Sequence, residues 1–145
     1  MKKLANSRIL LVGCGKMGSA ILNGWIDQNI EGSNICVIEP QKNHLNPFLK
    51  HGVTAYNSLK DLQHHYEPDF VVFAVKPQIM NEIVPTYKCF SGTSLFISIA
   101  AGKSIAYFES QLGKQNAIIR AMPNTPAAIG RGITVACGNS SVKKQ

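Results

Sequence analysis

The chain has 145 residues, which suits one folded domain of ordinary size. Hydrophobic residues make up 45% and charged residues 16% of the sequence, which excludes a disordered chain, and no apolar run approaches the ~18 residues of a membrane span. The net charge of +7 comes from 15 dispersed lysines and arginines. Because no aromatic residues are interleaved with them, we expect no nucleic-acid partner and only a general attraction for anionic ligands.

The N-terminus and the cysteines bear on the compartment and on metals. Two lysines, Lys2 and Lys3, open the chain, but the apolar run at 9–12 is shorter than the about 7–15 residues of a secretory signal. We therefore expect a cytoplasmic protein. The four cysteines form no CxxC pair and no zinc spacing, so we expect no metal site. We interpret them as small apolar fillers of the core: Cys14, Cys36, Cys89 and Cys137.

Apolar runs and helical spacings alternate along the chain. In order, we predict a strand over 8–13, a helix over 17–28, a strand over 35–39, a helix over 46–51 with Asn46 as its N-cap, a short strand over 53–56, a capped helix start at 58–61, a strand over 70–75, a helix over 77–84, a strand over 94–99, a helix over 104–112, and strands over 117–121 and 132–137. This alternation predicts a single α/β domain with a doubly wound, mostly parallel Rossmann-type sheet.

A glycine-rich turn follows the first predicted strand and opens the first predicted helix. In this position the pattern Gly-x-Gly-x-x-Gly is typical of dinucleotide binding. The first glycine permits a tight turn, the second lets the backbone approach a pyrophosphate, and the third allows close packing of helix on strand, while free N–H groups and the helix dipole favour the anion. The alternative is a plain tight turn. The candidate cofactor-binding residues are Gly13, Cys14, Gly15, Lys16, Met17 and Gly18.

Glu39 ends the second predicted strand, 21 residues after Gly18. An acidic residue at this point commonly accepts hydrogen bonds from the adenosine ribose, and its charge would repel a 2′-phosphate, which favours NAD. Lys42 lies nearby and would offset that charge for NADP. A solvated glutamate is the alternative, so the cofactor stays open as NADP or NAD.

Three further groups of residues follow strands and therefore lie at the carboxyl edge of the predicted sheet, where ligands bind in open α/β folds. Lys76 is either a donor to cofactor or substrate carboxylate, or a surface lysine. The small residues after the strand at 94–99 leave room for the nicotinamide ribose or serve close packing. Asn124 and Thr125, held between two prolines, form either a wall of the nicotinamide site or a structural turn. The candidates are Ala74, Val75, Lys76, Pro77, Ile99, Ala100, Ala101 and Asn124.

Catalytic side chains do not stand out in the sequence. It shows no Ser-His-Asp set and no carboxylate pair, so the catalytic residues remain unknown. The histidines lie in or beside predicted helices among polar neighbours, and we interpret all four as surface residues: His44, His51, His64 and His65.

Four blocks together resemble pyrroline-5-carboxylate reductase, in the order and at the spacing of that family. They are Gly-Cys-Gly-Lys-Met-Gly at 13–18, Ala-Val-Lys-Pro at 74–77, Ser-Ile-Ala-Ala-Gly at 98–102 and Arg-Ala-Met-Pro-Asn-Thr-Pro-Ala at 120–127. The resemblance implies hydride transfer from NAD(P)H to the C=N carbon of 1-pyrroline-5-carboxylate, giving L-proline. It also implies that Glu39 and Asn57 meet the adenosine ribose or its 2′-phosphate, and that residues 74–77 and 99–101 line the nicotinamide half.

The chain departs from the family in two ways. Glu39 replaces a residue that is often small and neutral, which puts the family's usual NADPH preference in doubt. Family members also continue into a helical C-terminal domain that dimerises and carries most of the substrate pocket, and residues 1–145 correspond to the NAD(P)-binding domain alone. Without that domain we expect an exposed apolar patch, association into a homo-oligomer or aggregates, and slow or absent proline formation.

Two other classes of protein compete with this interpretation. One is a stand-alone NAD(P)-binding module or an inactive truncated homologue. The other is a sister reductase with the same N-terminal fold, such as a hydroxyacid dehydrogenase, although the Met-Pro-Asn-Thr-Pro block at 122–126 argues against it.

Overall fold

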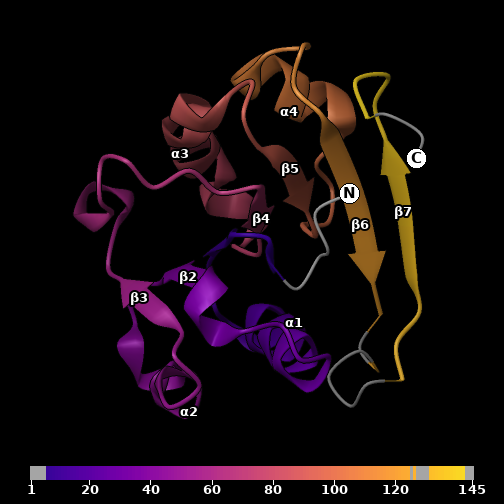
Figure 1. The fold of residues 1–145 in the computed structure, drawn as a ribbon. Coiled ribbons are helices and arrows are strands. Elements are labelled where there is room, and N and C mark those ends of the chain that lie inside the picture. Colours follow the sequence, from indigo (N-terminus) through magenta and orange to yellow (C-terminus); the bar gives the residue numbers. More distant parts are fainter. Residues whose placement is uncertain (1–5, 125, 127–130, 143–145) are drawn as a thin grey trace.

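The computed structural model describes residues 6–124, 126 and 131–142. They form a seven-stranded sheet in the order β3-β2-β1-β4-β5-β6-β7 (Figure 1). All neighbouring strands pair in parallel except β6 and β7, which are antiparallel. This confirms the predicted doubly wound α/β fold. The strands are β1 Ile9–Val12, β2 Ile35–Ile38, β3 Thr54–Tyr56, β4 Phe70–Phe73, β5 Leu95–Ser98, β6 Ile118–Pro123 and β7 Thr134–Gly138.

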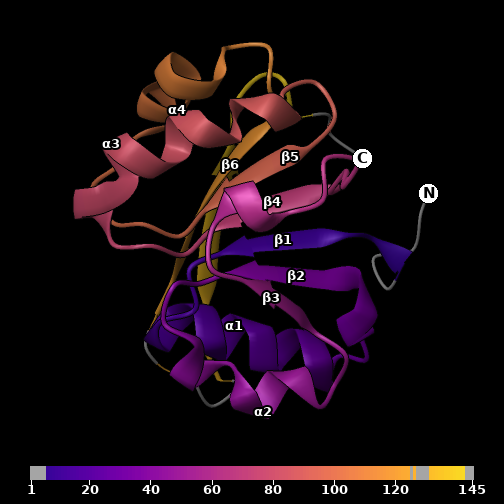
Figure 2. The same ribbon diagram turned by 90° about the vertical axis from the view of Figure 1, so that its left-hand side faces the viewer.

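Helices lie on both faces of the sheet, with α1 and α2 on one side and α3 and α4 on the other (Figure 2). The chain builds the sheet outward from β1 to β3, returns to β4 beside β1, and then builds outward again. Strand order therefore reverses between β1 and β4, which is where open α/β sheets bind their ligands. The helices are α1 Lys16–Asp27, α2 Asn46–Leu49, α3 Met80–Ile83 and α4 Ile105–Leu112, with 3₁₀ turns η2 Gly32–Asn34, η3 Lys42–His44, η4 Leu59–Asp61, η5 Pro77–Ile79 and η6 Val84–Phe90.

Three predicted helices differ from the structure in extent. The helix predicted to end at Val84 continues as η6, because a proline is tolerated in the first turn of the 3₁₀ segment. The capped start at Ser58 leads into a single 3₁₀ turn, closed by a capping box between Ser58 and Asp61. Helix α2 begins at Asn46, with Leu45 as its N-cap residue, so the prediction that Asn46 is the N-cap is wrong. The turns η2 and η3 were not anticipated by the sequence.

The sheet separates two apolar cores, and the alternation of side chains along each strand assigns residues to one or the other. In β1, Leu10 and Val12 face the core beneath α3 and α4, while Ile9 and Leu11 face the core beneath α1 and α2. Phe73 of β4 is fully buried in the first core and lies 5.4 Å from Tyr87, 6.2 Å from Phe96 and 6.0 Å from Phe108 between ring centroids.

The β6–β7 edge of the sheet is different in character. All five residues of β7 are exposed. Apolar side chains of the β6–β7 hairpin are in contact with solvent: Met122 is 44%, Ile133 72% and Val135 70% exposed. The prediction that the four cysteines fill the core is therefore half wrong. Cys14 and Cys36 are buried, whereas Cys137 lies on this edge strand and Cys89 on η6, and both are exposed.

Candidate functional site

The turn at 13–18 lies where strand order reverses, and the loop after β4 lies against it. Gly13 has φ +90°, a conformation that side chains rarely adopt. A Cβ atom on Gly13 would lie 2.7 Å from Val75 Cγ1 and 3.0 Å from the Ala74 carbonyl oxygen. The fold therefore requires glycine at this position, and the structure brings the predicted residues Gly13, Ala74 and Val75 together.

Gly18 and Gly15 differ in what surrounds them. A Cβ on Gly18 would lie 2.5 Å from the Gly13 carbonyl oxygen, so close packing of α1 on the turn explains the third glycine. A Cβ on Gly15 would meet no described atom within 4 Å, and its φ of −70° and ψ of −160° suit any residue. Neither backbone conformation nor packing within the described chain requires glycine at position 15.

The amino end of α1 is prepared for an anion. Gly15 is its N-cap residue, and no side chain in the described part of the chain caps the helix with a hydrogen bond. The first turn of the helix contains no acidic side chain. The first N–H groups of a helix have no intrahelical acceptor, and the helix dipole places partial positive charge there. Gly15 and Lys16 are exposed and Met17 is half-buried, so this end faces solvent. These features fit a pyrophosphate group.

Glu39 reaches back from the end of β2 to the glycine turn. Its Oε2 accepts a hydrogen bond from the Cys14 N–H at 2.8 Å, and its Oε1 accepts one from the Gln41 N–H at 2.9 Å. The carboxylate is therefore held by two backbone donors. The Cys14 N–H is engaged in the fold and is therefore not among the free N–H groups that the turn offers to a phosphate.

Cys14 itself has a structural environment. Burial raises the pKa of its thiol, a hydrogen bond with Ser19 lowers it, and the Glu39 charge raises it further. The Ser19 hydroxyl donates to the Cys14 carbonyl oxygen at 3.0 Å, which ties the turn to the first turn of α1. The thiol is therefore protonated at neutral pH and acts as part of the turn.

Asn57 follows β3 directly and is exposed. The Glu39 N–H donates to the Tyr56 carbonyl oxygen at 2.9 Å, so the ends of β2 and β3, and with them Glu39 and Asn57, lie at the same edge of the sheet. Lys42 begins η3, but its side chain is outside the described part of the structure.

The turn after β5, residues 99–101, is held by three neighbouring strands. The Ile99 N–H donates to the Phe73 carbonyl oxygen at 3.2 Å, and the Ala100 N–H donates to Ser98 Oγ at 3.2 Å. Arg120 Nη2 of β6 donates to the Ala100 carbonyl oxygen at 2.7 Å. In the sequence, Arg120 stands out only as part of the block at 120–127 that resembles the family. A cation inside an apolar strand is nevertheless a signal that its side chain has a specific partner.

The remaining candidates lie nearby or outside the described chain. Lys76 is exposed and Pro77 half-buried at the start of η5. Asn124 closes the β6–β7 hairpin, where its N–H donates to the Ile133 carbonyl oxygen at 3.2 Å and its Oδ1 accepts from the Ile133 N–H at 2.9 Å. Thr125 lies outside the described residues. All four histidines are exposed, as predicted.

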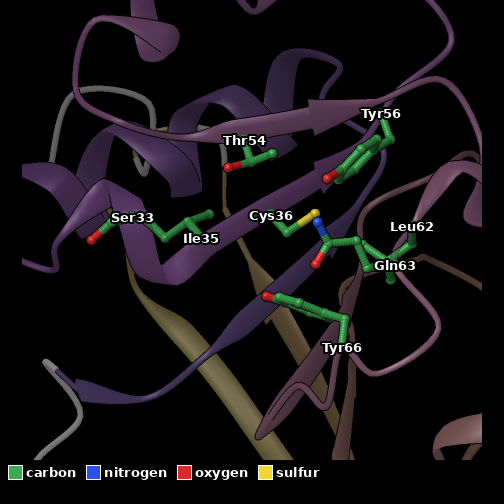
Figure 3. Close-up of a pocket in the computed structure, with 8 residues that line it drawn as sticks. All are labelled: Ser33, Ile35, Cys36, Thr54, Tyr56, Leu62, Gln63 and Tyr66. Atoms are coloured by element: carbon green, nitrogen blue, oxygen red, sulfur yellow. The ribbon is translucent and has the colours of Figure 1, made fainter.

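A small cavity lies away from this edge. It has a volume of about 190 Å³ and is formed over the β2–β3 face of the sheet, where Gln63 and Tyr66 lie across from Cys36 and Tyr56 (Figure 3). The Tyr66 hydroxyl donates to the Ile9 carbonyl oxygen at 3.3 Å, and burial raises the pKa of Cys36 to about 12. This cavity is lined by the first residues of β2 and by Thr54 and Tyr56 of β3, and none of the residues that line it belongs to the glycine turn or to the loops after β4 and β5, so we do not assign it to the candidate site.

Two further features concern metal ligands and membrane-spanning helices in the described ranges. No three His, Cys, Asp or Glu side chains within them gather as a metal site. Of the helices in residues 6–124, 126 and 131–142, none has the length and apolar character needed to cross a membrane.

Known proteins match both the sequence and the fold. The pyrroline-5-carboxylate reductase of Escherichia coli K12 is 34% identical over 138 residues, which are 93% of this chain and 51% of that protein. The structure of a pyrroline-5-carboxylate reductase from Coxiella burnetii has a TM-score of 0.86 at 33% identity, covering 95% of this chain and 52% of that one. The Plasmodium falciparum enzyme with NADP bound has a TM-score of 0.83 at 31% identity, covering 97% and 51%.

These matches confirm the resemblance to pyrroline-5-carboxylate reductases. The chain spans about half the length of the relatives that it matches. The profile of the family described as NADP oxidoreductase, coenzyme F420-dependent, matches residues 8–102, well over half of the chain. The chain therefore belongs to the NADP oxidoreductase coenzyme F420-dependent family.

Proposed function

We propose that residues 1–145 form the NAD(P)-binding domain of a pyrroline-5-carboxylate reductase. The reaction is hydride transfer from NAD(P)H to the C=N carbon of 1-pyrroline-5-carboxylate, giving L-proline. The similarity to reductases of this name over about nine-tenths of the chain supports the assignment. Because the chain spans about half of those relatives, substrate binding and turnover are expected to need residues beyond this domain.

Gly15 is the observation that carries the cofactor assignment. Gly13 and Gly18 are explained by the protein's own packing, but a side chain on Gly15 would meet no described atom within 4 Å. Open space in front of an uncapped helix N-terminus is what a close approach of pyrophosphate to the backbone needs. The requirement for glycine at this position then comes from the ligand and not from the fold.

The other predicted residues have complementary roles in this proposal. The turn at 13–18 holds the pyrophosphate, Glu39 and Asn57 contact the adenosine ribose, and residues 74–77, 99–101 and Asn124 line the nicotinamide half. The bound nicotinamide supplies the hydride, and the chain's own residues bind and orient it. We also propose that the protein is cytoplasmic and forms a homo-oligomer.

We further propose that NADH is preferred over NADPH. The Glu39 carboxylate is anchored by the N–H groups of Cys14 and Gln41, so moving it away would leave two backbone donors without their acceptor. A fixed negative charge beside the adenosine ribose accepts hydrogen bonds from ribose hydroxyls and repels a 2′-phosphate.

A pair of alanine variants tests the cofactor site. Gly15→Ala should weaken NADH binding at least tenfold, measured by the change in NADH fluorescence on titration of the 145-residue chain. Its stability should fall by no more than about 1 kcal/mol, because alanine is a poorer N-cap residue than glycine. Gly24→Ala is the matched control, since Gly24 lies in the same helix and a Cβ there also meets no described atom. It should bind NADH within twofold of the unchanged chain. Equal binding by both variants would refute the proposed site.

Adding 1-pyrroline-5-carboxylate to the NADH complex separates the remaining alternatives. A bound cofactor that is not consumed is expected for a cofactor domain acting alone. Oxidation of NADH at a rate near that of a complete reductase would show that the chain builds a substrate site by itself, and would contradict our assignment. The same binding-only result from a longer chain that includes all residues downstream of Gln145 would favour a stand-alone nucleotide-binding module.

A further inference from the structure

Arg120 connects β6 to the turn after β5. It shares a face of β6 with the buried Ile118, because the two residues are separated by two positions in the strand. Its register partner in β5 is Ser98, and its side chain extends toward the carboxyl end of that strand, where Nη2 donates to the Ala100 carbonyl oxygen at 2.7 Å. Nε of the same guanidinium is buried and has no hydrogen-bond partner among the described residues.

The turn at 99–101 owes its position to contacts from β4, β5 and β6. The first two are a backbone hydrogen bond from Ile99 to β4 and one from the Ala100 N–H to a serine hydroxyl of β5. The contact from β6 is made by Arg120 and is charge-assisted, so it is the stronger and more directional kind.

Burial shows how a contact at Ala100 would influence its neighbours. Ala100 is 4% exposed, so its side chain points into the protein, whereas Ile99 is half-buried and Ala101 is exposed. Gly102 follows with φ +72° and ends the turn. Holding the carbonyl group of the buried residue fixes where the two flanking residues face the surface, at the carboxyl edge of the sheet.

We infer that Arg120 is a positioning residue for the nicotinamide half of the cofactor, acting through the Ala100 carbonyl group on the surface formed by Ile99 and Ala101. This inference rests on the proposed function, in which that turn lines the nicotinamide. A displacement of about 1 Å in the groups that position a ligand is enough to disturb strongly an interaction that depends on their geometry. Loss of the guanidinium therefore affects the nicotinamide end and spares the adenosine and pyrophosphate end.

Two ligands separate these ends in one experiment. NADH contains the nicotinamide ring, whereas ADP-ribose has both phosphates and both riboses without it. In Arg120→Met, NADH binding should weaken at least fivefold while ADP-ribose binding stays within twofold of the unchanged chain, each measured by calorimetric titration of the same preparation. Partial unfolding lowers the occupancy of both ligands together, so the ratio of their affinities does not report a general structural defect.

Arg8→Met is the matched control. The Arg8 side chain is 43% exposed and lies 4.0 Å from Glu67. Arg8 precedes β1 at the amino ends of the parallel strands, away from the turn after β5, so both affinities should stay within twofold. Arg120→Lys keeps the charge and one donor but loses the guanidinium geometry, and should recover only part of the NADH affinity lost in Arg120→Met. If Arg120→Met fails to fold, Arg120→Lys decides alone: an NADH to ADP-ribose ratio at least twofold below that of the unchanged chain supports the role.

Other outcomes overturn the inference. Arg120 is not coupled to the nicotinamide end if a folded Arg120→Met loses affinity for NADH and ADP-ribose equally, or keeps the ratio of the two affinities unchanged. The same conclusion follows if Arg120→Met does not fold and Arg120→Lys keeps that ratio unchanged. Failure of the unchanged chain to bind either ligand would refute the proposed function itself, and is distinguishable from those results.

Discussion

The centre of the sheet and its β6–β7 edge differ in how far their residues are buried. All four residues of β1 are buried between two apolar cores, and the glycine turn that follows is hydrogen-bonded to Glu39 and lies close against Ala74 and Val75. All five residues of β7 are exposed, and Ile133 and Val135 are at least 70% exposed. The comparison indicates that the glycine turn at the centre of the sheet is organised by the chain's own residues, while the hairpin exposes apolar side chains of the kind that usually lie in contacts with other surfaces.

Thiol reactivity should show the largest difference between these regions. Cys36 lies in the inner strand β2, between β3 and β1, where burial raises its pKa to about 12, so only about 10⁻⁴ of it is thiolate at pH 8. Cys137 lies exposed on β7. We expect alkylation of Cys137 at least ~10³-fold faster than that of Cys36, measured by mass spectrometry of the labelled peptides.

The pH dependence of Cys36 labelling has a defined sign. Because its pKa is raised, the thiolate fraction and the labelling rate should rise about tenfold per pH unit between pH 7 and pH 9 in the folded protein. Comparable rates for Cys36 and Cys137 at pH 8 would break the comparison, since they would show that β2 is as accessible as β7.

Core truncation should come next in size. Phe73→Ala removes a fully buried ring that contacts three other aromatic rings, and should lower the free energy of unfolding by roughly 3–5 kcal/mol. Val135→Ala on β7 is the control, and should change it by less than about 0.5 kcal/mol. Urea denaturation followed by circular dichroism measures both. A similar loss for the two variants would mean that the exposed edge is packed in solution.

Cofactor selectivity should change by an intermediate amount. Glu39→Gln removes the fixed charge that we propose lies beside the ribose and keeps an amide oxygen for a backbone N–H, so NADPH binding should tighten about tenfold, or about 1.4 kcal/mol. NADH binding should stay within threefold. Fluorescence titration with both cofactors measures the ratio. If the unchanged chain binds NADPH as tightly as NADH, the proposed role of the Glu39 charge is wrong.

Self-association at the hairpin should give the smallest effect. Ile133→Thr together with Val135→Thr makes two exposed apolar side chains more polar, and should weaken association of the chain about threefold without lowering its thermal stability. Sedimentation velocity over a range of concentrations measures this. A chain that is monomeric before substitution, at all concentrations, would contradict the expectation that the apolar edge drives association.

Much of the fold and part of the site were predictable because their signals are local. Continuous apolar runs predicted all seven strands, and their alternation with helices predicted the doubly wound sheet. The glycine turn was recognisable because its three glycines stand at fixed spacing between a strand and a helix. The extents of the short helices were less predictable. The segment from Ser58 closes after a single 3₁₀ turn with a capping box, and η6 extends beyond Val84 with Tyr87 and Phe90 buried in the core.

The sequence by itself determined the order of the elements, the position of the glycine turn and the presence of an acid at the end of β2. Only the tertiary structure decided that the Glu39 carboxylate binds the Cys14 N–H, that a Cβ atom on Gly15 would meet no packed atom within 4 Å in the described chain, and that Arg120 holds the Ala100 carbonyl group. The two hydrogen bonds join residues that are 25 and 20 positions apart in the chain. Their formation depends on which strands become neighbours, and that is set by the burial of both faces of the whole sheet.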